Sequence, residues 1–118
     1  MTVIDLRSAK GLVQACLTAN PRRFPDCTGD SHAYSLTVPA GPEVHLDFGQ
    51  IPAGRYAIAL LHDENGNGRA DKTLMIPREG FGFSRDAAVH MGPPKFAAAA
   101  FEVGGRAVEQ TIRMRYLL

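Results

Sequence analysis

Short apolar segments, each stopped by glycine or proline, are the sequence feature that most limits what this chain can fold into. Residues 34–38 and 44–48 alternate apolar and polar side chains, which is the period of a strand with one buried face. Residues 55–62 are apolar almost throughout, and this pattern predicts a strand buried on both faces. The other predicted strands are 2–7 and 12–17, which we expect to pair as a hairpin, and a last strand at 108–116.

About seven short strands with regularly spaced turns favour an all-β, immunoglobulin-like sandwich. The 118 residues suffice for one hydrophobic core, so we expect a single β-sandwich domain over residues 1–118. Glycine, proline and asparagine are dense between residues 63 and 94, which predicts a long, elaborated loop region. Gly104-Gly105 predicts a hairpin between a strand at 101–103 and the last strand.

The charged residues argue against nucleic acid or a membrane surface as a partner. Lys and Arg number 13, Asp and Glu number 12, and the arginines are spread along the chain instead of clustering. No apolar run approaches the roughly 20 residues that a membrane-spanning helix needs, so we expect no membrane insertion. Residues 1–6 are too short for a signal peptide, and an exported protein would therefore have lost its export signal.

Cys16 and Cys27 are the only two cysteines. A disulfide between them is the economical prediction, because Cys16 lies in an apolar strand and Cys27 in a polar loop that can fold back towards it. Such a bridge would stabilise the fold by roughly 3 kcal/mol in an oxidising compartment. The alternative is a pair of reduced thiols in a cytosolic protein. Two cysteines without a paired histidine or cysteine motif do not predict a zinc site.

A loop of oxygen-bearing side chains begins where the strand at 55–62 ends. Counted from Asp63, oxygen side chains occupy the first, third, fifth and ninth positions, and a glycine at the sixth permits the chain to reverse. This is the front half of a calcium loop, with an expected affinity on the order of 0.1 to 1 mM. The twelfth position is Leu74, so a more remote carboxylate must close the shell. The candidate ligands are Asp63, Asn65, Asn67, the Arg69 carbonyl, Asp71 and Glu79.

The same loop has a metal-free interpretation. Asn65-Gly66 and Asn67-Gly68 are strong turn dipeptides, and Asp and Asn side chains readily hydrogen-bond to their own backbone. A purely structural loop therefore needs no cation.

Two histidines and a carboxylate give an enzymatic hypothesis. His62, Glu79 and His90 would serve as the acid and base groups of a small hydrolase or isomerase. The sequence places no nucleophile beside a base, and loop-organising hydrogen bonds explain these residues equally well. Phe81 and Phe83 either pack the loop onto the sandwich or line a ligand cleft with His62 and His90.

Longer motifs run through most of the chain: PAGRYAIALLHDENGNG at 52–68, IPREGFGFS at 76–84, GPPKF at 92–96, FPDC at 24–27 and IRMRY at 112–116. Together they closely resemble a bacterial family known as domain of unknown function 2141. The resemblance implies an exported protein whose signal peptide has been removed, which in turn supports the disulfide. It also implies a transthyretin-like or immunoglobulin-like sandwich, and it implies no activity. The chain lacks the Tyr-Arg-Gly-Ser ending of the transthyretin-like purine-pathway hydrolases.

Three functional hypotheses follow from these patterns. The leading one is a periplasmic or secreted, non-enzymatic module whose calcium loop rigidifies residues 63–94 for a protein or glycan partner. The second is the small hydrolase or isomerase that uses His62, Glu79 and His90. The third is a structural module with a metal-free loop.

Overall fold

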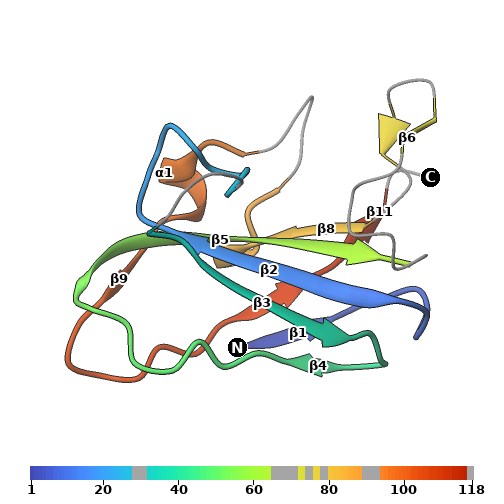
Figure 1. Cartoon of the computed structure of the whole chain (residues 1–118), viewed down its shortest axis with the longest axis horizontal. Helices are drawn as coiled ribbons and strands as arrows, with labels where there is room; N and C mark the ends of the chain where they lie inside the picture. The colour runs from blue at the N-terminus through green and yellow to red at the C-terminus, as the bar shows by residue number, and fades with distance from the viewer. Residues whose placement is uncertain (28–31, 65–71, 74–75, 78–79, 89–93, 117–118) are drawn as a thin grey trace.

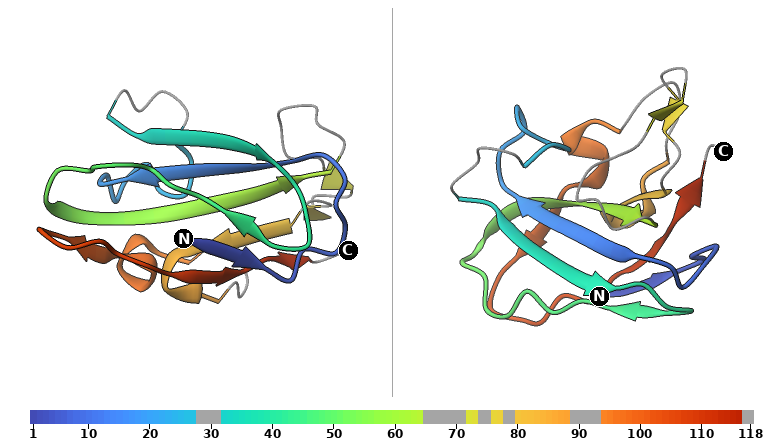
Figure 2. Two further views of the ribbon diagram at one scale, coloured as in Figure 1. Left: turned by 90° about the horizontal axis from the view of Figure 1, so that it is seen from below. Right: turned by 45° about the vertical axis from the view of Figure 1, so that its right-hand side comes forward.

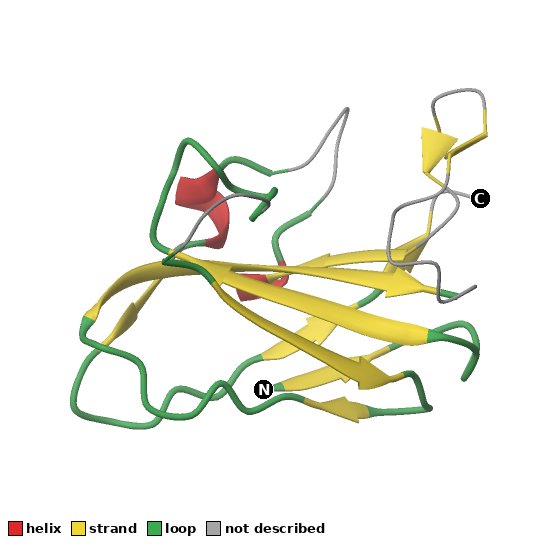
Figure 3. Cartoon of the chain, viewed as in Figure 1, coloured by secondary structure: helices red, strands yellow, loops and turns green. Residues whose placement is uncertain are grey.

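The computed structural model describes residues 1–27, 32–64, 72–73, 76–77, 80–88 and 94–116, and these are mostly strands joined by loops (Figures 1 and 3). The elements are β1 (Thr2–Ile4), β2 (Leu12–Thr18), β3 (Tyr34–Pro39), β4 (Val44–His45), β5 (Gly54–Asp63), β6 (Lys72–Thr73), β7 (Ile76–Pro77), β8 (Gly80–Phe83), the 3-10 turn η1 (Ser84–Asp86), the one-turn helix α1 (Phe96–Ala99), β9 (Phe101–Val103), β10 (Thr111–Arg113) and β11 (Arg115–Tyr116).

Two sheets pack face to face, as Figure 2 shows. The small sheet has the strand order β10-β1-β4. The large sheet has the order β11-β8-β5-β2-β3, and β9 pairs with the first residues of β5. Strands β6 and β7 form a separate two-stranded ribbon. The all-β sandwich expected from the alternating segments is confirmed.

Strand β5 is the centre of the large sheet, because it is paired with β2 on one side and β8 on the other. Its alternate residues Tyr56, Ile58 and Leu60 are buried in the main core between the sheets. Ala57, on the opposite face, is completely buried in a second cluster. The predicted strand buried on both faces is therefore confirmed.

The second cluster covers the outer face of the large sheet. The ring of Phe24 meets the rings of Phe83 and Phe96 edge-on, with centroid distances of 5.8 and 6.0 Å. Ser84 follows Phe83 in the chain, and its buried hydroxyl accepts a hydrogen bond from the Ile58 N–H and donates one to the Ala99 carbonyl. One side chain thus joins η1, the central strand and α1.

Two predicted hairpins are wrong. Strand β1 does not pair with β2 but lies in the small sheet, between β4 and the distant β10. Strand β9 pairs with β5, and not with the strand after Gly104-Gly105. The predicted last strand also divides, since β10 belongs to the small sheet and β11 to the large one. Alternation identifies which face of a strand is buried, but it does not specify the partner strand.

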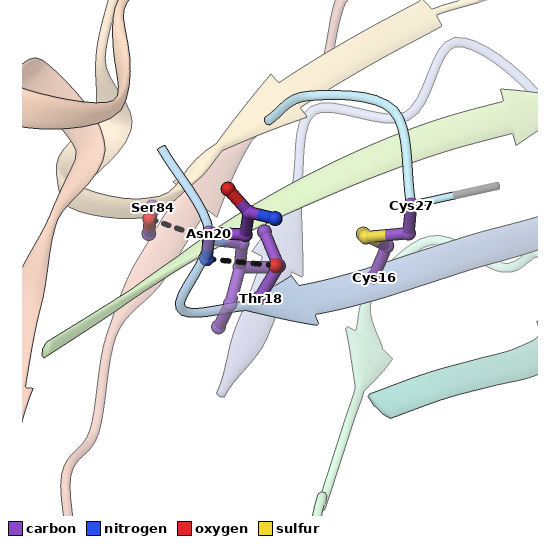
Figure 4. Close-up of a disulfide and its surroundings, with 6 residues drawn as sticks. Cys16, Thr18, Asn20, Cys27 and Ser84 are labelled. Atoms are coloured by element: carbon purple, nitrogen blue, oxygen red, sulfur yellow. Dashed lines mark hydrogen bonds between the residues drawn. A yellow bond between two sulfur atoms is a disulfide. The ribbon is translucent and has the colours of Figure 1, made fainter. Parts of the chain in front are cut away.

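The two cysteines are joined in a disulfide, as predicted (Figure 4). Cys16 lies in β2, Cys27 lies in the loop that follows, and their Cα atoms are 6.2 Å apart. Nearby, the Asn20 N–H donates to the Thr18 hydroxyl, and the Asn20 side chain accepts from the Arg22 N–H. These turns fold the chain after β2 back along the sheet.

Candidate functional site

Strand β5 ends in the polar residues His62 and Asp63, and Glu64 follows directly. His62 and Asp63 are completely buried, and Glu64 is half-buried. They pack against the turn between β1 and β2, against β2 itself and against β11. We call this group the strand-end cluster, and its members are Arg7, Ser8, Gln14, His62, Asp63, Glu64 and Tyr116.

Both ring nitrogens of His62 are engaged. The Nε2 atom lies 2.8 Å from the carbonyl oxygen of Lys10, and because a carbonyl only accepts, Nε2 carries the hydrogen. In the neutral ring Nδ1 then accepts a hydrogen bond from the Tyr116 hydroxyl, at 2.6 Å. The Tyr116 oxygen accepts in turn from the Arg7 backbone N–H at 3.1 Å. His62 therefore connects the β1–β2 turn to β11 inside the protein.

Glu64 is held by the same turn. Its Oε1 atom accepts from Nε and Nη2 of Arg7, at 2.9 and 2.5 Å, and its Oε2 atom accepts from the Ser8 hydroxyl at 2.7 Å. The hydrogen bond from Arg7 is the main reason that the pKa of Glu64 falls from 4.5 to about 2. The Arg7 guanidinium also lies 4.5 Å from the centre of the Tyr116 ring, and burial raises the pKa of that tyrosine.

Gly11 allows the β1–β2 turn to lie directly on the end of β5. Its φ is +73°, and a Cβ atom there would overlap the backbone of Asp63 and Glu64. The first residues of the 63–71 loop are therefore packed between β2 and this turn.

Asp63, the first predicted calcium ligand, is in register with Leu12 of β2. Its Oδ2 atom accepts a hydrogen bond of 3.4 Å from the Gln14 side chain. The other predicted ligands lie outside the described residues; they are Asn65, Asn67, Arg69, Asp71 and Glu79. Within the described part of the chain, no three His, Cys, Asp or Glu side chains are grouped so that they could hold a metal ion.

The predicted ligand cleft does not form from its described members. His62 shares the inner face of β5 with Leu60, whereas Phe83 is opposite Ala59 and belongs to the outer cluster. Phe81 packs against the same outer cluster. The sheet thus separates His62 from both phenylalanines, because neighbouring residues of a strand point to opposite faces. His90, like Glu79, lies outside the described residues.

Sequence reasoning missed the residues that fix the end of β5. Tyr116 had one usable signal, since it follows Ile112 and Met114 at alternate positions and had to reach the inner face. Arg7 and Ser8 had none, because they contact Glu64 across 57 and 56 positions of the sequence.

Comparison with known proteins identifies a family. A profile of uncharacterized proteins conserved in bacteria, DUF2141, matches residues 1–111, as the sequence motifs predicted. No curated protein and no solved structure matches the chain. No helix in the ranges that the structure describes is long and apolar enough to cross a membrane. Because the profile covers almost the whole chain, the protein belongs to the bacterial DUF2141 family.

Proposed function

We propose that this protein is an exported, non-enzymatic binding module whose loop from Asp63 to Asp71 binds calcium. Calcium would rigidify the loop that follows β5 and prepare it for a protein or glycan partner at the cell envelope. The observation that supports this proposal most directly is the position of Asp63. Its carboxylate is completely buried at the end of a strand that is paired on both sides, so the first ligand has a fixed position.

The side chain of Glu64 also supports the proposal. In a calcium loop, alternate side chains point towards the ion, and the second position points away. Glu64 occupies that second position, and its carboxylate is turned towards Arg7 and Ser8. The acid next to Asp63 is thus neutralised by a cation of the protein and does not repel the other loop carboxylate.

Export is supported by the disulfide. A bridge between Cys16 and Cys27 persists in the periplasm or outside the cell, whereas cytosolic thiols are kept reduced. A non-enzymatic role is supported by His62, because a general base needs a nitrogen available to substrate, and both nitrogens of this buried ring are engaged within the protein.

A calcium titration followed by backbone amide NMR tests the proposal. We expect the amides of residues 63–71 to shift and to saturate below about 10 mM calcium, and magnesium to produce much smaller shifts because it prefers a tighter octahedral shell. Unmoved amides in this segment at 10 mM calcium would refute the proposal and favour the structural module with a metal-free loop.

Two charge-removing variants locate the ion. Asp71→Asn should weaken calcium binding severalfold without affecting β5, and Asp63→Asn should weaken it further because that ligand is preorganised. Asp47→Asn is the matched control: Asp47 is exposed, and its Oδ1 accepts from the Gly49 N–H, which the Asn oxygen can also do. Equal affinities in all three variants would contradict binding at this loop.

A further inference from the structure

Strand β3 forms one edge of the large sheet, as Figure 1 shows. It pairs with β2 along its whole length, beginning with Tyr34 opposite Leu17. Among the described strands, none pairs with the other side of β3. A strand edge of this kind presents a row of N–H and C=O groups to which a further strand can bond.

The phase of the β2–β3 ladder decides which groups of this edge face outward. Just beyond β3, the Ala40 N–H donates to the Gly11 carbonyl at 3.1 Å, on the side of β2. In an antiparallel pair, alternate residues bond to the neighbouring strand. Counting back from Ala40, we find that Ser35 and Thr37 direct their N–H and C=O groups away from β2. In the part of the chain that the structure describes, these groups have no backbone partner.

The side chains of β3 leave the inner face of the sandwich partly open at this edge. Tyr34, Leu36 and Val38 lie opposite buried core residues of β2 and therefore share their face. Leu36 and Val38 are only partly buried against the main core, and Tyr34 is 37% exposed. The side chains of Ser35 and Thr37, on the outer face, are exposed. A further strand at this edge would thus bury apolar side chains on one face and meet hydroxyls on the other.

Charge does not protect the edge. Natural sheets commonly discourage contact between edges with lysine or with other charged side chains. The six residues Tyr34–Pro39 carry no charge. The one residue that hinders pairing is Pro39, which lacks an N–H and lies at the very end of the strand. A second copy of the same strand can therefore approach without electrostatic repulsion.

We infer that two copies of this chain associate through β3, in antiparallel orientation, with Leu36 on the twofold axis. In this register Tyr34 lies opposite Val38 of the second copy, and Ser35 lies opposite its Thr37. Pairs of an aromatic with a β-branched side chain, and of two hydroxyl side chains, stabilise neighbouring strands. The outward N–H and C=O groups of Ser35 and Thr37 would bond across the interface in both directions. The two large sheets would become one continuous sheet.

Other registers are less complementary. Sliding the copies by two residues in one direction would place Ser35 opposite Pro39, which has no N–H to donate. Sliding them equally far in the other direction would place Val38 opposite the polar His32. A slide of one residue would set the outward groups opposite residues that already bond to β2. The register centred on Leu36 is therefore the one that the strand itself favours.

Sedimentation equilibrium of the whole chain tests the association. An interface made by one strand from each copy is small, so we expect a dissociation constant between about 10 µM and 1 mM. The mean mass should rise from that of one chain towards that of two as the concentration passes through this range. A chelator in the buffer removes calcium, so the result is separable from that of the loop titration.

Hydrogen exchange identifies the strand that pairs. When about nine-tenths of the chains are paired, exchange at the Ser35 and Thr37 amides should slow about tenfold, because these N–H groups are exposed only in the remaining tenth. The Leu36 N–H faces β2 and is the internal control, so its exchange should change much less.

Two double variants test the register. Ser35→Lys with Thr37→Lys would place lysine opposite lysine, and it should raise the dissociation constant at least tenfold. Ser35→Lys with Thr37→Glu changes the same exposed positions but places each lysine opposite a glutamate, and it should retain the dimer. Unchanged amide shifts in β5 verify that each variant is folded, and the exchange measurement on the parent protein needs neither variant.

Three outcomes would overturn the inference. The first is a mass that stays at that of one chain at 1 mM, which would leave this edge to a strand of a different protein. The second is a dimer in which exchange at Ser35 and Thr37 does not slow. The third is an equal dissociation constant for the two double variants, which would exclude the antiparallel register centred on Leu36.

Discussion

Arg7 and Glu64 form an ion pair in which both Nε and Nη2 of the guanidinium donate hydrogen bonds to Oε1 of the carboxylate. The pair joins the turn after β1 to the first residue beyond β5. Since the Ser8 hydroxyl binds the other carboxylate oxygen, the start of the 63–71 loop is fixed to the turn at two points. The energetic consequences of this junction can be measured without any ligand.

The first prediction concerns pH. Because the pKa of Glu64 is about 2 in the folded protein and 4.5 ordinarily, the stability that this carboxylate provides is present above pH 4.5. It is lost as the pH falls from 4.5 towards 2. Urea unfolding at pH 7 and pH 3 should show that Glu64→Gln has the smaller loss of stability on acidification.

At pH 7 the same variant should lose about 0.2–1 kcal/mol, and less in high salt, because the pair is partly open to solvent. Glu102→Gln, at an exposed position of β9, is the control and should behave like the parent protein. Identical pH profiles for Glu64→Gln and Glu102→Gln would contradict the role given to Arg7.

The second prediction concerns the hydroxyl of Tyr116. Tyr116→Phe leaves Nδ1 of the buried His62 without its donor and the Arg7 N–H without its acceptor, which should cost about 1–3 kcal/mol in unfolding free energy. Tyr34→Phe removes a hydroxyl from an exposed tyrosine and should cost little. A comparable, small loss in both variants would show that the His62–Tyr116 hydrogen bond contributes nothing to stability.

The third prediction concerns Gly11. Gly11→Ala places a Cβ atom at a φ of +73° and against the backbone of Asp63 and Glu64, so it should destabilise the fold by more than about 1 kcal/mol. Gly104→Ala is the matched control, since a Cβ atom there meets nothing within 4 Å. Thermal unfolding of the two variants makes the comparison, and equal melting temperatures would argue against close packing of the β1–β2 turn on β5.

The fourth prediction concerns the disulfide. Replacing both Cys16 and Cys27 by serine should lower the unfolding free energy by about 3 kcal/mol, because the unfolded chain regains the freedom of the closed loop. The difference from the parent protein should vanish when a strong reductant is present. Detection of two free thiols in the untreated, denatured protein would instead mean that the bridge is not formed.

The sequence was informative where one strand could be judged by itself. The apolar segment ending at His62 predicted the central strand, since a strand flanked on both sides and covered on both faces needs few polar residues. The partner of β1 could not be predicted in this way. It is β10, with Val3 in register with Ile112, and no local pattern connects positions so far apart.

The same distinction between local and long-range features applies to the candidate site. Asp63 could be singled out because its neighbours along the chain carry oxygen side chains. The proposed grouping of His62 with Phe83 failed because it depends on the register between β5 and β8, which places the phenylalanine opposite Ala59 on the outer face. The anchoring of Glu64 likewise depends on a turn that only the tertiary fold brings near.

Between β10 and β11 the chain passes from the small sheet to the large sheet, and this has a mechanical consequence. Met114, between the two strands, donates its N–H to the Ile4 carbonyl of the small sheet, and the next two residues pair with Phe81 and Gly80 of the large sheet. A pulling force applied at Tyr116 would load the large sheet first and the small sheet only from Met114, two residues back along the chain. Pulling the chain back from Tyr116 therefore breaks the hydrogen bonds of the two sheets in succession, first those to β8 and then those to β1.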